Sequence, residues 1–360
     1  MQRLIYEIEN NDENPYTYII KGLENQYDVI ESLKDEIHSP DFAETFRKAN
    51  HSLSPGSYKD MTNTILTVST MASEEQQNIL DDKGITPWPL GHRLVSKFDA
   101  PSQAISNEHY ESLKLFEESN TKYDNSSLFT IYKYLDWNVM LFVLLLFVLL
   151  LWTTISEERS PNPAINFLVT KPIRFTSIYI TKWAYNLVVA YSLLLISGAV
   201  IFLFATLIGG LGETEYPILV YAPNRLEDHF FFSPGDNAYF YFENLATLIV
   251  KSGILIFTQI FFLNGLFSLV GKLMKNHYAS IVVTLIIVIV GYSLGNHYIE
   301  INNMYFNPFI YFDSWNIVDG WKSIEANNGK VNFLNGTVIL FISGSLLFCI
   351  GLLFKRKVTS

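Results

Sequence analysis

The hydrophobic pattern divides the chain into a polar first part and a second part dominated by long apolar runs. A helix needs about 20 mainly apolar residues to cross the hydrocarbon core of a bilayer. Five segments meet this requirement, and we predict transmembrane helices at about 137–155, 183–208, 244–270, 278–294 and 333–354. One such run also fits a buried helix of a soluble protein, but five in succession favour a polytopic membrane protein.

The polar residues 1–136 carry apolar side chains at helical spacing over three stretches, at 25–37, 60–80 and 107–123. The second stretch leads to Gly84, which can end a helix, and turn-rich segments separate the three. These patterns predict a mainly helical aqueous domain. The predicted fold class is therefore an all-α polytopic membrane protein with a large, mainly helical extracellular domain at 1–136 and a transmembrane domain at 137–354.

Composition supports this division of the chain. Hydrophobic residues make up 49% of the sequence and charged residues 17%, below the roughly 25% usual in soluble domains. Residues 1–136 hold 23 Asp and Glu against 12 Lys and Arg, which makes this part acidic.

The loops between the apolar runs alternate in charge, and this alternation predicts the orientation. The segments 156–182 and 271–277 and the tail 355–360 together hold 9 basic and 2 acidic residues, whereas 212–243 and 295–331 are mainly acidic. Because Lys and Arg accumulate in cytoplasmic loops, we expect a cytoplasmic C-terminus and an extracellular domain at 1–136. Exporting that domain without a preceding span would be unusual, so we also expect a sixth span just upstream of Met1.

The segment 157–182 contains the most specific pattern in the chain. Asn162 can cap a helix whose first turn holds Pro163, and Pro172 then ends it. The short helix between them exposes Ile165, Phe167 and Leu168. It fits either an interfacial helix that anchors the loop or a docking site for a cytosolic partner.

This segment resembles the permeases of type-2 ABC exporters. That family has an acidic residue at the end of a span, then a Gly-Thr pair, a Leu-rich stretch closed by Pro, and a Lys that opens the next span. Glu157 and Glu158, Phe167-Leu168, Pro172, Arg174 and Lys182 follow this order, although Asn162-Pro163 replaces the Gly-Thr pair. A second similarity is the aromatic run from Asn307 to Asp313 before the last predicted span.

The resemblance implies a function and a set of partners. It implies a permease that exports a peptide-like, amphipathic or lipid substrate, paired with a second permease subunit and embedded in lipid. A separate cytosolic ATPase would bind ATP and Mg and dock on a coupling helix in 156–182. This chain would then be no enzyme and hold no cofactor of its own. The usage of Asn, Ile and Phe suggests the cell membrane of a low-GC bacterium.

Three polar residues in the third predicted span are candidates for a substrate path. Lys251 lies either about 12 Å inside that span or, as we favour, at its outer end with the span beginning at Ser252. Gln259 and Asn264 lie deeper, where hydrogen bonds between helices are the favoured role.

No catalytic, metal or nucleic-acid motif stands out. His38, His51, His92 and His109 are isolated, and the glycines of 265–272 are spaced wrongly for a phosphate-binding loop. The alternatives to export are a membrane sensor with an extracellular ligand-binding domain and, ranked below it, a membrane-embedded enzyme.

Overall fold

The computed structural model describes residues 67–89, 93–104, 107–137, 143–144, 175–222, 240–274, 276–301 and 303–353. The chain divides into two compact units, Met1–Tyr123 and Asp124–Ser360. Each unit is described below by itself. The first predicted span, apart from residues 137, 143 and 144, lies outside the described residues, as does the helix expected at 25–37.

The first unit is built on two helices, α4 (Thr67–Lys83) and α5 (Asn107–Ser119), with the 3-10 turns η2 (Lys97–Asp99) and η3 (Pro101–Gln103) between them. The prediction that Gly84 ends α4 is confirmed. Gly84 has a positive φ of 65°, and the Ile85 amide donates to the Leu80 carbonyl at 2.9 Å in a Schellman-type ending. The amide of Ser69 donates to the carboxylate of Asp99 at 3.0 Å, which ties η2 to α4.

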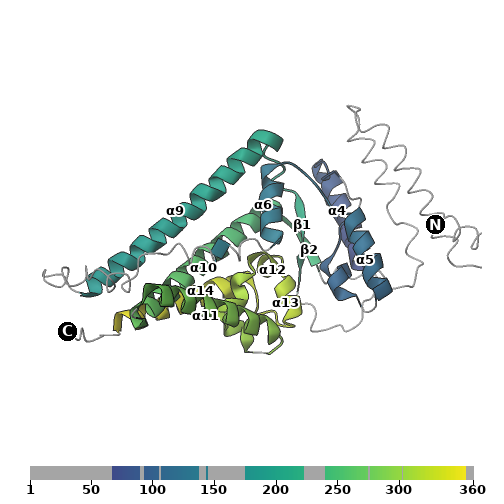
Figure 1. The fold of residues 1–360 in the computed structure, drawn as a ribbon. Helices are drawn as coiled ribbons and strands as arrows, with labels where there is room; N and C mark the ends of the chain where they lie inside the picture. The colour runs from purple at the N-terminus through teal and green to yellow at the C-terminus, as the bar shows by residue number, and fades with distance from the viewer. Residues whose placement is uncertain are drawn as a thin grey trace, which may run out of the picture. The chain divides into compact units, whose positions relative to one another are not determined.

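The second unit consists mainly of long helices with a small hairpin between two of them (Figure 1). Its elements are, in chain order, α6 (Ser127–Asp136), α9 (Phe175–Gly209), β1 (Pro217–Tyr221), β2 (Phe240–Asn244), α10 (Leu245–Leu273), α11 (His277–His297), η6 (Met304–Phe306), η7 (Pro308–Phe312), α12 (Ser314–Val318), α13 (Trp321–Glu325) and α14 (Phe333–Leu353).

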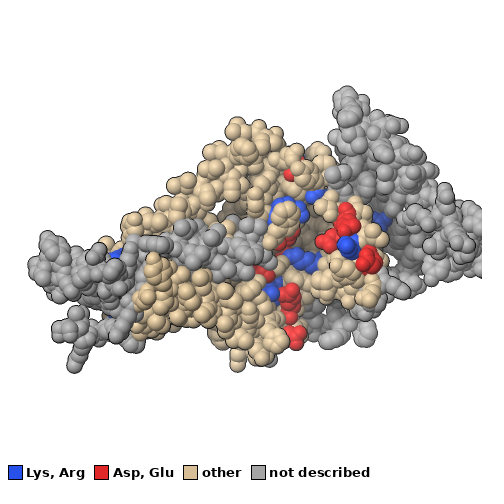
Figure 2. All heavy atoms as spheres, viewed as in Figure 1, with Lys and Arg blue, Asp and Glu red and all other residues tan. Residues whose placement is uncertain are grey.

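Four of the described helices, α9, α10, α11 and α14, are long and apolar enough to cross a membrane. They correspond to the second to fifth predicted spans. Apolar side chains such as Leu195, Leu203 and Phe204 are exposed on α9, and Figure 2 shows its surface almost free of charge. Exposed apolar helix surfaces of this extent are typical of a membrane protein.

One helix start differs from the sequence prediction, and another agrees with it. The second span was predicted from 183, but α9 begins at Phe175, so residues 175–182 are helical and not part of a loop. The third span was predicted from 244, and α10 begins at Leu245 and contains Lys251. Whether the membrane begins at Ser252 along this helix stays a prediction. Residues 175–182 contain no proline or glycine, so nothing in this stretch prevents the helix from beginning at Phe175.

Helix α10 forms the centre of the second unit, and α14 packs closely along it. A side chain at Gly265 of α10 would meet the carbonyl oxygen of Gly344 of α14 at 2.7 Å. Glycines at such a crossing let two helix backbones approach closely. Gly265 therefore serves close packing of α10 and α14, and α9 ends at Gly209.

The hairpin before α10 was not predicted. Strands β1 and β2 pair antiparallel, with Pro217 opposite Asn244 and Tyr221 opposite Phe240. All five residues of β1 are buried. The Tyr221 amide donates to the Asp319 carbonyl at 2.7 Å, which joins β1 to the turn between α12 and α13.

The predicted acidic loop between the last two spans is a packed part of the second unit. Ile310, Tyr311 and Phe312 of η7 are almost completely buried. Contacts at glycines explain how η7 fits there, because a side chain at Gly291 of α11 would overlap Phe309 and one at Gly336 of α14 would overlap Tyr311. The aromatic run from Asn307 to Asp313 is therefore a core element.

Candidate functional site

The predicted docking segment lies almost entirely outside the described residues. This holds for Glu157, Glu158, Asn162, Pro163, Ile165, Phe167, Leu168 and Pro172. Lys182 is described, and it lies in the third turn of α9 and not in a loop. The role of these residues in docking stays a prediction.

The first turns of α9, which directly follow that segment, are anchored to α10 and α14 by aromatic side chains. Tyr179 stacks on Phe348 of α14 with ring centroids 5.7 Å apart. Trp183 contacts the same ring at 4.4 Å and meets Phe261 of α10 edge-on at 5.4 Å. Gly351 of α14 makes room for this contact, because any side chain there would overlap the Tyr179 hydroxyl.

Lys272 of α10 lies in the same region and is only 2% exposed. Its ammonium donates to the Gly351 carbonyl and lies 5.0 Å from the centre of the Tyr179 ring. A desolvated ammonium gains about 2 kcal/mol or more over an aromatic face. The sequence placed Lys272 in a charged loop, but the structure places it inside α10 as the residue that connects three helices.

Lys251 forms an ion pair with Glu243 at the end of β2. Its ammonium lies 2.7 and 2.8 Å from the two carboxylate oxygens. The side chain therefore extends back toward the first residue of α10 and away from the middle of the helix. About a third of the Lys251 side chain remains exposed. Its charge is balanced by a neighbour, as expected of a lysine in an apolar helix.

Gln259 and Asn264 are completely buried and bind other elements of the second unit. The Gln259 amide donates to the Tyr311 carbonyl and, at 2.9 Å, to the Ser314 hydroxyl. The Asn264 amide donates to the Trp183 carbonyl at 3.0 Å. The favoured expectation of hydrogen bonding between helices is confirmed, whereas a role in a substrate path stays a prediction.

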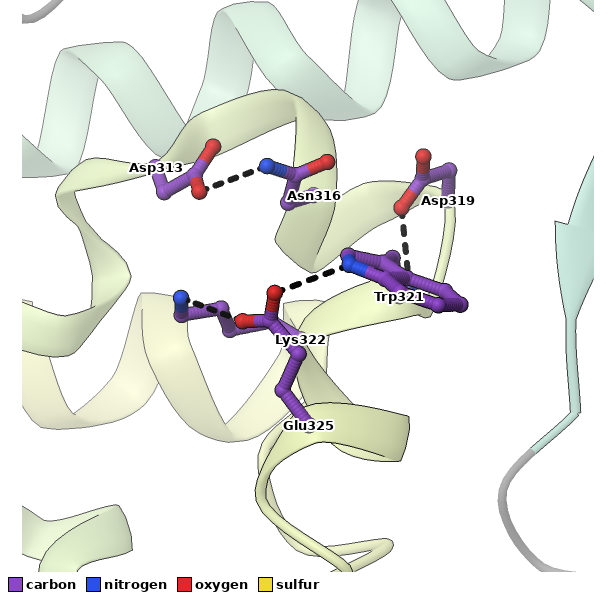
Figure 3. Close-up of polar contacts among 6 residues, drawn as sticks. All are labelled: Asp313, Asn316, Asp319, Trp321, Lys322 and Glu325. Carbon is purple, nitrogen blue, oxygen red and sulfur yellow. Dashed lines mark hydrogen bonds and ion pairs between the residues drawn. The ribbon is translucent and has the colours of Figure 1, made fainter. Parts of the chain in front are cut away.

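A polar cluster in α12, α13 and the turns before them was missed at the sequence level (Figure 3). Lys322 pairs with Glu325 at 2.6 Å, and the indole N–H of Trp321 donates to the same carboxylate at 2.9 Å. Asp319 accepts the Trp321 amide at 2.9 Å. The sequence signal was the mixture of charged and aromatic residues in this segment, since a solvated acidic loop is seldom rich in aromatic side chains.

Asp313 differs from the other members of this cluster. It is only 4% exposed, and one carboxylate oxygen, Oδ2, accepts from the Asn316 amide at 2.7 Å. The other oxygen, Oδ1, is buried without a hydrogen-bond partner, and Figure 3 shows it pointing away from the other five residues. Although Asp313 is at the N-cap position of α12, its side chain makes no capping hydrogen bond.

Tyr132 of α6 lies beside this part of the second unit, with its ring 5.1 Å from that of Trp315. Burial raises the pKa of its hydroxyl well above the ordinary value, and the charges of Asp136 and Asp319 raise that pKa further. Tyr132 therefore stays neutral at physiological pH and serves packing.

The described residues contain no group of three or more His, Cys, Asp or Glu side chains that could hold a metal ion. Comparison of the chain with protein-family models, with curated proteins and with solved structures finds no match. A functional assignment must therefore rest on the sequence pattern and on the geometry described above.

Proposed function

We propose that this chain is the membrane-spanning permease of an ATP-binding-cassette exporter. It would move a peptide-like, amphipathic or lipid substrate outward with energy from a separate ATPase subunit. The observation that carries the proposal is the sequence pattern of 157–182, with its acidic pair, the Asn162-Pro163 pair that predicts the start of a short helix, the closing Pro172 and the basic residues. The four long apolar helices support a polytopic membrane location.

The position of α9 suggests how such a permease would use the ATPase. Because α9 is continuous over 35 residues, it is about 50 Å long at 1.5 Å per residue. Its first residue follows the proposed docking segment closely, and its first turns are anchored to α10 and α14 through Tyr179 and Trp183. A force on the docking segment would therefore act on three helices together.

The far end of α9 offers a route for the same movement. The amides of Ser127 and Leu128 in α6 donate to the carbonyls of Gly210 and Leu211 at 3.0 and 3.2 Å. A side chain at Gly209 would overlap the backbone of Asn125. In this mechanism a tilt of α9 moves α6 with it. ATP and Mg would act only in the partner ATPase, and a second permease subunit would complete the translocation path.

Docking can be tested by co-purifying the full-length protein with any ABC-type ATPase encoded beside it. Changing Phe167 and Leu168 together to Asp places two charges on the apolar side of the predicted short helix. We expect the yield of the complex to fall about 100-fold or more, because losing central apolar contacts weakens an interface by about 2 kcal/mol or more each. The matched control exchanges the two side chains, Phe167→Leu with Leu168→Phe.

The exchange variant keeps the apolar character and should retain the ATPase. Unchanged association of the double Asp variant, at a normal level of protein in the membrane, would contradict docking at this helix.

A membrane sensor is the second candidate, favoured by the separate compact unit that precedes the long helices. It predicts that the purified protein has no ATPase partner. It also predicts that deleting the first unit removes signalling, whereas an exporter would keep its ATPase complex after the same deletion.

A further inference from the structure

Three large apolar side chains are exposed in the short segment between α11 and η7. Tyr298, Ile301 and Phe306 are 46%, 54% and 61% exposed, whereas Ile299 between them is buried. Residues 298–301 and 303–306, called the apolar turn below, therefore have one side on the protein core and an apolar side that faces away from it.

The length of α11 determines the level at which the apolar turn lies. This helix has 21 residues and is about 31 Å long at 1.5 Å per residue. That length matches the hydrocarbon core of a bilayer, which is about 30 Å thick, and α11 is one of the described helices apolar enough to cross it. The residues that directly follow His297, the last residue of α11, therefore lie at a membrane surface.

Hydrogen bonds keep the apolar turn close to this level. The amides of Ile301, Met304 and Asn307 each donate to the carbonyl three residues earlier, at 3.1, 2.8 and 2.8 Å. A chain bonded in this way advances only about 2 Å per residue. The end of the turn is also held against α11, because a side chain at Gly295 would lie 2.7 Å from the side chain of Ile310.

The exposed ring of Phe306 is fixed by its neighbours. Its centroid lies 4.0 Å from that of the Tyr305 ring. Tyr305 is fixed in turn, because its carbonyl accepts the hydroxyl of the buried Tyr311 at 2.7 Å. The Lys330 ammonium lies 5.2 Å from the centre of the Tyr305 ring on the same side of the unit. Phe306 is thus connected to the core while its own ring stays exposed.

The apolar turn continues a surface that already faces lipid in a membrane-spanning α11. Val290 and Leu294, in the last two turns of that helix, are 47% and 49% exposed. The exposed Glu300 limits how deep the turn can lie, because a charged side chain in the hydrocarbon core is costly. Aromatic side chains are enriched at the level between these limits, where the headgroups lie.

We propose that Tyr298, Ile301 and Phe306 insert into the headgroup region of the lipid leaflet at the C-terminal end of α11. The apolar turn is then an interfacial anchor, which holds the end of α11 and the start of η7 at the membrane surface. The proposal rests on the membrane location of the long helices and not on the proposed transport function.

The test places nitroxide labels on single cysteines of the full-length protein in lipid nanodiscs, with Cys349 changed to Ser. Paramagnetic relaxation by oxygen, which concentrates in lipid, is compared with relaxation by a water-soluble nickel chelate. We expect labels at Ile301→Cys and Phe306→Cys to be more accessible to oxygen than to the chelate.

Two exposed positions give the reference values. Ile286→Cys, in the middle of α11 and 54% exposed, should show the oxygen preference of a lipid-facing site. Glu213→Cys, in the exposed connection between α9 and β1, should show the chelate preference of a site in water.

Three results would overturn the proposal. Chelate accessibility at Ile301→Cys and Phe306→Cys equal to that at Glu213→Cys would place the apolar turn in water. Protection from both reagents would show that protein covers it, and spectral broadening that disappears on dilution with unlabelled protein would identify that protein as a second copy of this chain.

A conservative variant covers the case in which the cysteine variants fail to fold. Phe306→Trp keeps a large aromatic side chain, and its added fluorescence relative to the wild type should be quenched by lipids brominated near the headgroup. Unquenched added fluorescence would also overturn the proposal.

Discussion

Polar side chains inside the second unit are mostly arranged so that each finds a partner on another element. Lys251 reaches Glu243, Gln259 binds Ser314, and Lys272 binds the Gly351 carbonyl. Such bonds are favoured because a buried polar group without a partner costs about 1–3 kcal/mol. They explain why these residues occur in helices that are otherwise apolar, before any role in transport is considered.

Glu75 of α4 makes a prediction at the residue scale in the first unit. Its Oε2 is buried without a hydrogen-bond partner, and burial raises the pKa of its carboxyl above the ordinary value. Because its pKa is higher in the folded state than in the unfolded chain, this carboxyl group favours folding when the pH is below the unfolded-state pKa of about 4.3. That contribution to the free energy of unfolding is lost as the pH rises through the folded-state pKa.

Glu75→Gln should therefore stabilise α4 at pH 7.5, by less than about 1 kcal/mol because solvent screens the partly exposed group, and have no such effect near pH 4. Hydrogen exchange of the α4 amides in the full-length protein measures this. Glu74→Gln, on the exposed side of the same turn, is the matched control and should show no difference. Equal protection of wild type and Glu75→Gln at both pH values would contradict the account.

At the scale of elements, the crossing of α10 and α14 depends on glycine. Gly265→Ala places a methyl group 2.7 Å from the Gly344 carbonyl oxygen, so the two helices must separate. Overpacking of this kind typically costs about 1–3 kcal/mol. We expect a fall of several degrees in the unfolding midpoint in detergent.

Gly253→Ala is the matched control on the same helix, because nothing lies within 4 Å of a side chain there. It should leave the midpoint unchanged or raise it, as Ala favours helix over Gly by about 1 kcal/mol. Equal midpoints of Gly265→Ala and Gly253→Ala would show that this crossing is not close-packed in solution.

The long helices were predictable from the sequence because apolar composition and length suffice to identify a span. The start of α9 was not predictable, because Thr176, Ser177 and Lys182 are polar residues that also fit a loop. The structure shows that this stretch is helical and that Tyr179 and Trp183 pack on Phe348. The hairpin was also missed, because its two short strands lie far apart in the sequence, with residues 222–239 between them.

The candidate sites were predictable to a smaller extent. Gln259 and Asn264 were expected to bond between helices, because an amide in an apolar helix has few other solutions. The burial of Asp313 and Lys272 could not be predicted, since a charged residue near the end of an apolar run is usually solvated. Only the tertiary contacts of η7 and α14 show otherwise.

At the scale of the whole molecule, the long helix α9 is anchored at both ends within the second unit. In the exporter proposal the docking segment directly precedes this helix. The four apolar helices support the membrane location. The exporter proposal adds an orientation, in which 156–174 faces the cytosol and 1–136 faces outward, from the alternation of basic and acidic loops.

This orientation is tested most directly by labelling single cysteines with a membrane-impermeant maleimide in intact spheroplasts and in lysed membranes. Cys349, the one cysteine of the chain, is first changed to Ser. Ser102→Cys, in the first unit, should react in both preparations, and Ser160→Cys, in the docking segment, should react only after lysis. Labelling of Ser160→Cys in intact spheroplasts with protection of Ser102→Cys would contradict the exporter proposal.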